Sequence, residues 1–260
     1  MPSVAMADDA EFNMTIQIPT IWWAHYLGDL AAWTGAALAA RWQYRRWPEA
    51  AQALARVTTP SYHVTLALGA LAGAWLLGSA NSLRSIAAAP SHSVAGALAG
   101  GILAVELWKW RHGVRQSTGA AFVLPLAVGI ALGRLGCLFS GLPDFTYGTP
   151  TTVPWGFDLG DGIARHPVQL YETIAMGLFA AVYIRARKAG LEWTKAHAFH
   201  ALIIFYAAQR FVWEFFKPYP HLAGPLNLFH MLMLGLMMYG LIWWRRGNPE
   251  PIGTESALGD

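Results

Sequence analysis

The segment 120–139, AAFVLPLAVGIALGRLGCLF, is long enough to cross a bilayer and carries a single charged residue, Arg134. A bilayer core of about 30 Å requires roughly 20 apolar residues in a helix. A guanidinium keeps its charge and is costly in hydrocarbon, so an arginine inside such a segment indicates a functional site that faces an anion. Segment 198–216 also contains an arginine, Arg210. Two such residues suggest that the anion is a phosphate.

The composition of the whole chain predicts an all-α, polytopic membrane protein. Hydrophobic residues make up 55% of the 260 residues and charged residues only 13%, a balance typical of membrane proteins. Gly96, Gly100 and Gly101 lie in the third apolar segment, where we expect them to let helix backbones pack closely. Seven segments of roughly spanning length are predicted to be transmembrane helices: 21–40, 62–78, 93–108, 120–139, 167–183, 198–216 and 226–244.

Lysine and arginine residues are concentrated in alternate loops and in the C-terminal tail. By the positive-inside rule these regions are cytoplasmic, which places the N-terminus outside and the C-terminus inside. They contain Arg41, Arg45, Arg46, Arg56, Lys109, Arg111, Arg115, Arg185, Arg187, Lys188, Lys195, Arg245 and Arg246. The other five positive residues fall in outer loops or in the outer halves of spans: Arg84, Arg134, Arg165, Arg210 and Lys217. This distribution predicts a cationic site that faces outward.

The same topology divides the chain into three regions. Residues 1–19 form an outer arm, because they lack the basic start and apolar core of a cleavable signal peptide. Residues 20–244 form the seven-helix domain, which includes an outer loop at 140–166. Residues 245–260 form a cytoplasmic tail rich in Gly, Pro and acidic residues, a composition typical of disorder.

Several classes of site are not indicated by the sequence. The single cysteine excludes an internal disulfide. Nothing resembles a zinc, P-loop or dinucleotide motif, so neither a metal nor a cofactor is expected. The formal net charge of +3 follows from basic cytoplasmic loops, and a nucleic-acid partner is therefore not expected.

The outer loop ends in the stretch RHPVQLYE at 165–172. Pro167 suits the first turn of a helix. Free backbone N–H groups at that helix start, next to Arg165, are a ready site for an anion at the membrane surface. The alternative is a proline that only begins a transmembrane helix.

Four stretches, in this order along the chain, resemble the prolipoprotein diacylglyceryl transferase family. They are His92 at the start of a glycine-rich segment, GRLG at 133–136, RHPVQLYE at 165–172, and the pattern of Tyr206, Arg210, Phe211, Glu214 and Phe215. The resemblance covers about residues 21–240. It implies a seven-helix enzyme of the bacterial cytoplasmic membrane with its active site facing outward.

The chain also departs from the family pattern. Cys137 replaces an asparagine, and Ser140 to Leu142 replaces the sequence Asn-Gly-Glu. Gly148 is the counterpart of a family glycine after a short insertion, and Lys217 stands where arginine is usual. These differences indicate a diverged member.

The family reaction moves a diacylglyceryl group from phosphatidylglycerol to the lipobox cysteine of a preprolipoprotein and releases glycerol phosphate. By resemblance, Arg134 and Arg210 bind the phosphate, Tyr206 contacts the head group, and His92 is either the base for the acceptor thiol or an interfacial helix cap. The resemblance and the neighbouring polar positions suggest further substrate-binding residues: Arg165, His166, Gln169, Tyr171, Glu172, Glu214, Cys137, Ser140 and Gly148.

Three polar residues leave alternatives open. Cys137 lies three residues after Arg134, so it is either a small packing residue or a thiol whose pKa the cation lowers for covalent catalysis. His25 and Asp29, one helical turn apart, either relay a proton or neutralise each other.

Three functions are compatible with these residues. The first is diacylglyceryl transfer to a thiol, foremost that of a lipoprotein. The second is a related lipid transferase with another acceptor. The third is a lipid or anion carrier whose arginines bind without reacting, although no internal repeat is found.

Overall fold

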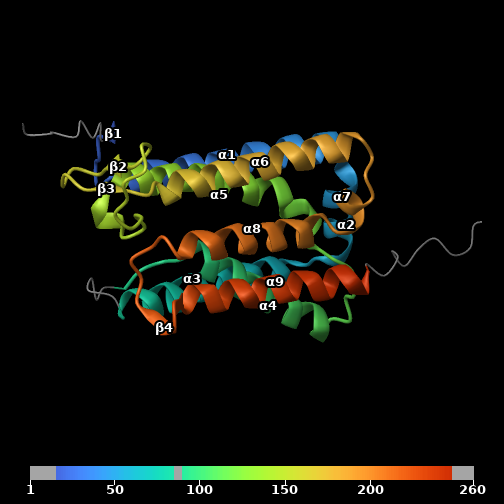
Figure 1. Cartoon of the computed structure of the whole chain (residues 1–260). Helices are drawn as coiled ribbons and strands as arrows, with labels where there is room; N and C mark the ends of the chain where they lie inside the picture. The colour runs from blue at the N-terminus through green and yellow to red at the C-terminus, as the bar shows by residue number, and fades with distance from the viewer. Residues whose placement is uncertain (1–15, 85–89, 248–260) are drawn as a thin grey trace, which may run out of the picture.

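The computed structural model describes residues 16–84 and 90–247, and helices make up most of it (Figure 1). Each predicted apolar segment overlaps a helix of 17 or more residues. The long helices are α1 (Ala24–Arg46), α3 (Pro60–Ser82), α4 (Val94–Arg111), α5 (Val123–Ser140), α6 (Val168–Lys188), α8 (Ala198–Glu214) and α9 (Leu228–Arg246). The short ones are α2 (Pro48–Val57), α7 (Trp193–Ala196), η1 (Gly119–Phe122) and η2 (Leu142–Asp144).

Three helical segments of the described residues are both long and apolar enough to cross a membrane. They are α3, α9 and the continuous segment Gly119–Ser140 formed by η1 and α5. Helix α8, which includes Arg210 and Glu214, is only 17 residues long and so falls short in length. The fold is thus that of an all-α membrane protein, with three segments that qualify as spans by composition alone.

Large apolar side chains cover the outer surfaces of several helices. Leu30 is 64% exposed, Trp33 78% and Leu76 70%. Water-soluble proteins rarely expose so much contiguous apolar surface. These side chains therefore have the environment they require only when lipid surrounds the helices.

Helices α1 and α5 pack against each other in antiparallel orientation. Near one end, the backbones of Gly28 and Gly136 touch, so that a Cβ on either glycine would collide with the other. Near the opposite end, the buried Gln43 side chain donates to the carbonyl oxygens of Ala120 and Ala121 and accepts from the N–H of Leu124. These contacts fix the position of α5, which carries Arg134.

Glycines also form the contact between α3 and α4. A Cβ on Gly73 would collide with the carbonyl oxygen of Gly96 and the backbone of Gly100, and a Cβ on Gly69 would collide with Gly100 and Ala104. The sequence prediction that Gly96 and Gly100 serve as packing contacts is therefore confirmed. Small residues allow such close approach because no side chain separates the two backbones.

Gly73→Ala is expected to destabilise the protein by about 1–3 kcal/mol, because the added methyl group has no space between α3 and α4. Thermal unfolding in detergent measures the effect. Gly177→Ala in α6 is the matched control, since a Cβ there meets nothing within 4 Å and alanine favours the helix. Equal unfolding temperatures for the two variants would contradict this account of the α3 and α4 contact.

The main buried apolar cluster lies between α5, α6, α8 and α9. It includes Leu124, Met176, Ile203, Tyr206 and Met233, each 2% exposed or less. Three of these helices carry Arg134, Glu172 and Arg210. The packing of the cluster between them therefore fixes where the three charged side chains lie.

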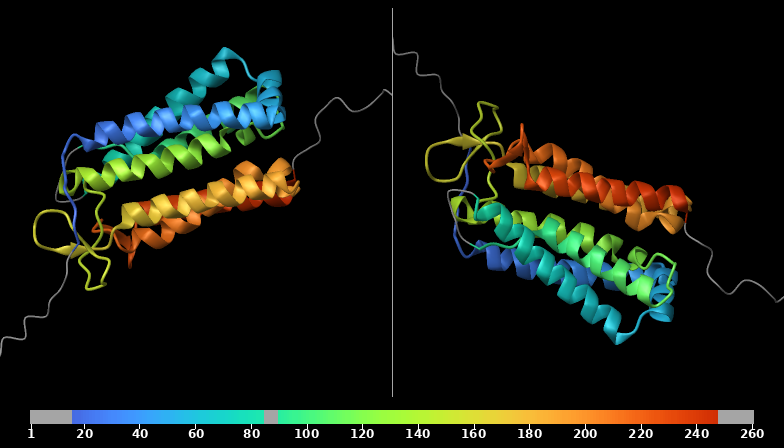
Figure 2. Two further views of the ribbon diagram at one scale, coloured as in Figure 1. Left: turned by 90° about the horizontal axis from the view of Figure 1, so that it is seen from above. Right: turned by 90° about the horizontal axis from the view of Figure 1, so that it is seen from below.

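Short strands lie at one end of the helices, and α2 and α7 lie at the other (Figure 1). Strand β1 (Ile16–Gln17) pairs in parallel with β2 (Phe157–Asp158), which pairs in antiparallel orientation with β3 (Ala164–Arg165). The separate hairpin of β4 (His221–Ala223) and β5 (Leu226–Asn227) lies at the same end. Figure 2 shows in two further views that the long helices run away from this end towards the opposite one.

The turn between β2 and β3 is fixed by one carboxylate. Asp158 Oδ1 accepts hydrogen bonds from the backbone N–H groups of Gly160, Asp161 and Gly162 at 2.8–3.1 Å. Gly160 and Gly162 have φ values of +104° and +77°, which a residue with a Cβ rarely adopts. The turn places Arg165 just before the start of α6.

Candidate functional site

Glu172, on α6, is the centre of a buried group of charges. Its side chain is fully buried. Arg134 Nε from α5 lies 2.7 Å from Glu172 Oε2, and Arg210 Nη1 from α8 donates to the same oxygen at 2.8 Å. Lys217 Nζ, just after α8, donates to Glu172 Oε1 at 2.7 Å. One carboxylate therefore holds cations from three regions of the chain.

Glu214 is the second carboxylate of the group. Its Oε1 accepts from Arg210 Nε at 2.6 Å and from Lys217 Nζ at 3.4 Å, and its Oε2 accepts from Asn227 Nδ2 at 3.3 Å. Glu214 thus forms an ion pair with Arg210, one helical turn before it on α8.

We refer to Arg134, Arg210, Lys217, Glu172 and Glu214 together as the ion network. Every member is 6% exposed or less. Three positive and two negative groups leave one net positive charge inside the protein. A buried charge is stable only with a partner, so the network has the right charge to accept one monoanion.

Two groups beside the network have hydrogen-bonding capacity that the described residues do not use. The buried Tyr206 hydroxyl has no partner among them, and it lies within electrostatic range of Arg134, Arg210 and both carboxylates. The contact of Arg134 with Glu172 is through Nε, and no hydrogen bond from either Nη of Arg134 to a described residue accompanies it. Buried polar groups normally have partners, and these donors suit the oxygens of an anion.

Arg165 lies in β3 and has a partner of its own. It donates to both carboxylate oxygens of Asp161, at 2.6 and 2.7 Å, and its guanidinium lies over the Tyr147 ring. These hydrogen bonds lower the pKa of Asp161 below its ordinary value, so the pair stays charged at neutral pH. The structure thus places the buried Arg165 in an ion pair with the partly exposed Asp161, and no ion pair among the described residues joins it to the buried charges around Glu172.

His166 and Tyr171 form an aromatic group at the start of α6. His166 Nδ1 lies 3.4 Å from the Tyr171 hydroxyl, and its ring contacts that of Phe216. Burial lowers the pKa of His166, so its imidazole is neutral at pH 7. The Tyr171 hydroxyl also accepts a hydrogen bond from Trp155 Nε1 at 2.9 Å.

Three further residues that the sequence suggested for substrate binding, Gln169, Ser140 and Gly148, contact protein groups near them. Gln169 Nε2 donates to Thr146 Oγ1 at 3.3 Å, and Ser140 Oγ donates to the Gly136 carbonyl oxygen at 2.9 Å. Gly148 packs so closely on the backbone of His166 that a Cβ would collide with it.

His92 lies just before α4, exposed, with its ring edge-on to Trp75 at 5.0 Å between centroids. The cap of α4 is the following residue, Ser93, whose hydroxyl accepts from the N–H of Gly96. No hydrogen bond or ion pair joins His92 to the ion network in the described part of the chain. Its role as base for an acceptor stays a prediction.

Lys217 and Asn227 complete the ion network and its surroundings, but neither was predicted to bind substrate. Lys217 stands three residues after Glu214. The sequence singled it out only as one of five positive residues outside the predicted cytoplasmic loops. Asn227 also caps α9, where its side chain accepts from the N–H of His230. Its contact with Glu214 joins the start of α9 to the end of α8, a relation that spacing along the chain does not reveal.

A family model described as "Prolipoprotein diacylglyceryl transferase" matches residues 30–246. Curated relatives carry the name phosphatidylglycerol–prolipoprotein diacylglyceryl transferase. The protein of Geobacter sulfurreducens is 39% identical over 138 residues, 47% of this chain and 50% of the relative. That of Nitratidesulfovibrio vulgaris is 34% identical over 175 residues, 61% and 62%. That of Wolinella succinogenes is 32% identical over 157 residues, 57% and 55%.

These alignments span between half and about three-fifths of the length of the relatives. The family model, in contrast, covers most of this chain and includes every member of the ion network. The protein therefore belongs to the prolipoprotein diacylglyceryl transferase family.

Proposed function

We propose that this protein transfers a diacylglyceryl group from phosphatidylglycerol to a thiol, foremost the lipobox cysteine of preprolipoproteins. The observation that carries the proposal is the ion network, which has one net positive charge beside the unpartnered Tyr206 hydroxyl and the free Nη groups of Arg134. A phosphodiester carries one negative charge and two free oxygens. It therefore matches the site in both charge and hydrogen bonding.

In the reaction, the acceptor thiolate attacks the glyceryl carbon bonded to the phosphate oxygen. The new C–S bond forms as the C–O bond breaks, and the electron pair leaves with glycerol phosphate. Negative charge on the leaving phosphate rises in the transition state. Fixed guanidinium donors in a buried site stabilise that charge more than water does, because they need no reorganisation as it develops.

Glu172 and Glu214 have an indirect part in this mechanism. They are buried and bonded to the cations at 2.6–3.4 Å. They hold the two arginines in place and reduce their mutual repulsion, so that one net charge is left for the phosphate. Such preorganisation of the donors is what makes a charged site effective.

We further propose the seven-span topology, with the N-terminus outside and the C-terminus in the cytoplasm. The last turns of α1, α4, α6 and α9 contain basic residues, as expected for cytoplasmic ends. The ion network would then lie towards the outer face of the bacterial cytoplasmic membrane. Its lipid donor is present there, and exported lipoprotein precursors reach the same face.

The test is a transfer assay with purified protein, phosphatidylglycerol micelles and a synthetic lipobox peptide, read by mass spectrometry. Diacylglyceryl-modified peptide together with released glycerol phosphate supports the proposal. Lipid cleavage without modified peptide would point to another acceptor. Lipid binding without cleavage would instead favour a carrier.

Tyr206→Phe is expected to lower the transfer rate about ten- to hundredfold, because a hydrogen bond to a charged group contributes about 1.5–3 kcal/mol. The free energy of unfolding should change little, since the hydroxyl has no protein partner to lose. Initial rates of the transfer assay and thermal unfolding measure the two effects.

Tyr62→Phe is the matched control, because the Tyr62 hydroxyl is also buried but donates to Thr118 Oγ1 at 2.9 Å. This variant should lose stability and keep its rate per folded molecule. The proposal for Tyr206 fails if its removal lowers stability as Tyr62→Phe does while the transfer rate stays at the wild-type level.

A further inference from the structure

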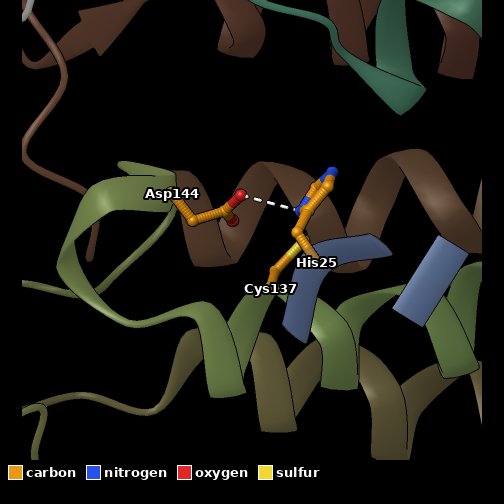
Figure 3. A group of neighbouring side chains, drawn as sticks. All are labelled: His25, Cys137 and Asp144. Atoms are coloured by element: carbon orange, nitrogen blue, oxygen red, sulfur yellow. Dashed lines mark ion pairs between the residues drawn. The ribbon is translucent and has the colours of Figure 1, made fainter. Parts of the chain in front are cut away.

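Three side chains from separate segments meet near the start of α1 (Figure 3). His25 comes from α1, Cys137 from the last turn of α5, and Asp144 from η2. One donor atom from each lies within 4.8 Å of the other two. His25 Nδ1 is 2.9 Å from Asp144 Oδ1. Sulfur, imidazole nitrogen and carboxylate oxygen thus converge on one point.

His25 and Asp144 form a close ion pair. The Nδ1 atom of His25 is buried and lies 2.9 Å from the Asp144 carboxylate oxygen. This nitrogen and this oxygen therefore lie close enough to bind one ion together with the Cys137 sulfur.

Other polar groups support the cluster from outside. His25 Nε2 lies 3.6 Å from Asp29 Oδ2, and Asp144 Oδ2 accepts from Thr146 Oγ1 at 2.6 Å. Histidine ligands of metals usually donate their second nitrogen to a carboxylate, and carboxylate ligands are themselves hydrogen-bonded. The Asp144 carboxylate has such a hydrogen bond, and Asp29 lies near enough to Nε2 to orient the His25 ring.

We propose that His25, Cys137 and Asp144 form a binding site for a divalent transition metal of the zinc type. Zn²⁺ binds cysteine, histidine and carboxylate in tetrahedral geometry. A thiolate and a carboxylate supply two negative charges that match the dication, and binding releases the thiol proton to solvent. No short motif reveals this site in the sequence, because its ligands lie at positions 25, 137 and 144 on three segments.

The site has three protein ligands and is open on one side. Cys137 is buried and the Asp144 side chain is 12% exposed, but the His25 side chain is 41% exposed. A zinc site with three protein ligands keeps a fourth position for water or substrate. The metal would therefore be accessible to a ligand at the exposed face of His25.

A thiol is the ligand that fits this fourth position, an inference that rests on the proposed function. The acceptor must lose its proton to attack carbon, and a thiol that binds zinc is deprotonated. The sulfur would bond to the metal, the proton would pass to solvent, and the thiolate would be presented for attack. Cys137 lies three residues from Arg134 on α5, about 4.5 Å along the helix axis, so thiolate and phosphate sites would be adjacent.

The same residues also raise the possibility of a nucleophilic cysteine with a histidine base, but the geometry favours metal. In such a triad the two nitrogens of the imidazole serve different partners, one the nucleophile and one the carboxylate. Here Asp144 lies at Nδ1, and Nε2 faces Asp29. Figure 3 shows Nε2 pointing away from the Cys137 sulfur.

Alkylation of the wild-type protein tests the metal site directly. Cys137 is the only cysteine of the chain, so the mass added by iodoacetamide reports this residue alone. Zn²⁺ is expected to slow the alkylation about tenfold or more, because the metal and its other ligands would cover the buried Cys137 sulfur, and EDTA should restore the rate. Rapid alkylation that Zn²⁺ leaves unchanged would overturn the proposal and indicate a free nucleophilic thiol.

Co²⁺ absorption identifies the ligands. The wild-type protein in detergent should bind one Co²⁺ per chain with a thiolate-to-metal charge-transfer band and tetrahedral d–d bands. Cys137→Ser should abolish the charge-transfer band, and His25→Gln and Asp144→Asn should each weaken binding about a hundredfold. Asp29→Asn should weaken it about tenfold through the orientation of His25. Unchanged binding in Cys137→Ser or Asp144→Asn would overturn the assignment.

His63→Gln is the matched control, because this exposed histidine lies on α3 and contacts only the carbonyl oxygen of Thr59 by hydrogen bonding. It should bind Co²⁺ as the wild type does. Elution as a single species in size-exclusion chromatography checks that each variant is folded. The wild-type alkylation test does not depend on any variant.

A lipobox peptide tests whether the acceptor thiol binds the metal as its fourth ligand, separately from whether the metal binds at all. Its cysteine thiol should shift the Co²⁺ d–d bands, whereas the same peptide with serine should not. Metal binding without this shift would overturn the fourth-ligand role. These measurements contain no lipid, so their outcome is independent of whether phosphatidylglycerol is cleaved.

Discussion

Glu172→Gln is expected to lower the free energy of unfolding by about 3–5 kcal/mol, because it leaves buried cations without their shared partner. Arg134, Arg210 and Lys217 all contact this carboxylate at 2.7–2.8 Å. Glutamine keeps the size of the side chain but removes the charge. Only Glu214 would then oppose three positive groups. Thermal unfolding in detergent, followed by tryptophan fluorescence, measures the loss.

Glu192→Gln is the matched control for this prediction. Glu192 also pairs with a lysine, at 3.0 Å, but its side chain is 83% exposed. An exposed ion pair contributes at most about 1 kcal/mol, so the unfolding temperature should hardly change. If Glu172→Gln were as stable as this control, Glu172 would not be the carboxylate that holds the cations together.

Arg134→Lys is expected to reduce the transfer rate by about a hundredfold or more while the protein remains folded. A lysine retains the positive charge that Glu172 requires, but it lacks the planar fork that binds two phosphate oxygens. Loss of one such donor at a developing negative charge costs about 10²–10³ in rate. The free Nη groups of Arg134 are the donors that this change removes. The measurement is kcat/KM for phosphatidylglycerol in the transfer assay.

Arg187→Lys is the matched control, because it makes the same chemical change far from the ion network. Arg187 lies on α6, at the end opposite to Glu172. Arg187 pairs with Glu49 of α2 and lies over the Trp47 ring. Its replacement should leave kcat/KM within about twofold, because it has no part in phosphate binding. A rate for Arg134→Lys equal to that of Arg187→Lys would show that Arg134 serves only as a partner for Glu172.

The sequence predicts the site residues that are recognisable by their charge or by their spacing along one helix. Arg134 and Arg210 are conspicuous as charges in apolar segments, and the pairing of Arg210 with Glu214 follows from a separation of four residues on one helix. The contact of Arg134 with Glu172 joins two helices and depends on how α5 and α6 pack. No periodicity along the chain contains that information.

Asp144 shows a different limit of sequence analysis. It lies between a proline and a phenylalanine in a loop rich in glycine and proline, where its spacing predicts nothing. The structure places it against His25, more than a hundred residues earlier in the chain. The sequence did indicate His25 and Asp29 as a pair, and they are 3.6 Å apart, but the partner on the other nitrogen depends on the fold.

Helix ends were also only partly predictable. Segment 21–40 was marked by its apolar residues, whereas α1 extends from Ala24 to Arg46. Charged residues such as Arg45 can continue a helix beyond the lipid, so hydropathy marks the part within the membrane and not the end of the helix. Helix α2 was not predicted, because its ten residues have polar and apolar faces and do not span a bilayer.

The pairing of β1 with β2 also sets an order for maturation of the protein. Ile16 and Gln17 are made before α1, but their partners, Phe157 and Asp158, follow only after α1, α3, α4 and α5. Closing so long a loop is entropically unfavourable until other contacts bring the ends together. The small sheet of β1, β2 and β3 at this end of the helices is therefore among the last parts to form. A chain that stalls during membrane insertion leaves that end uncovered.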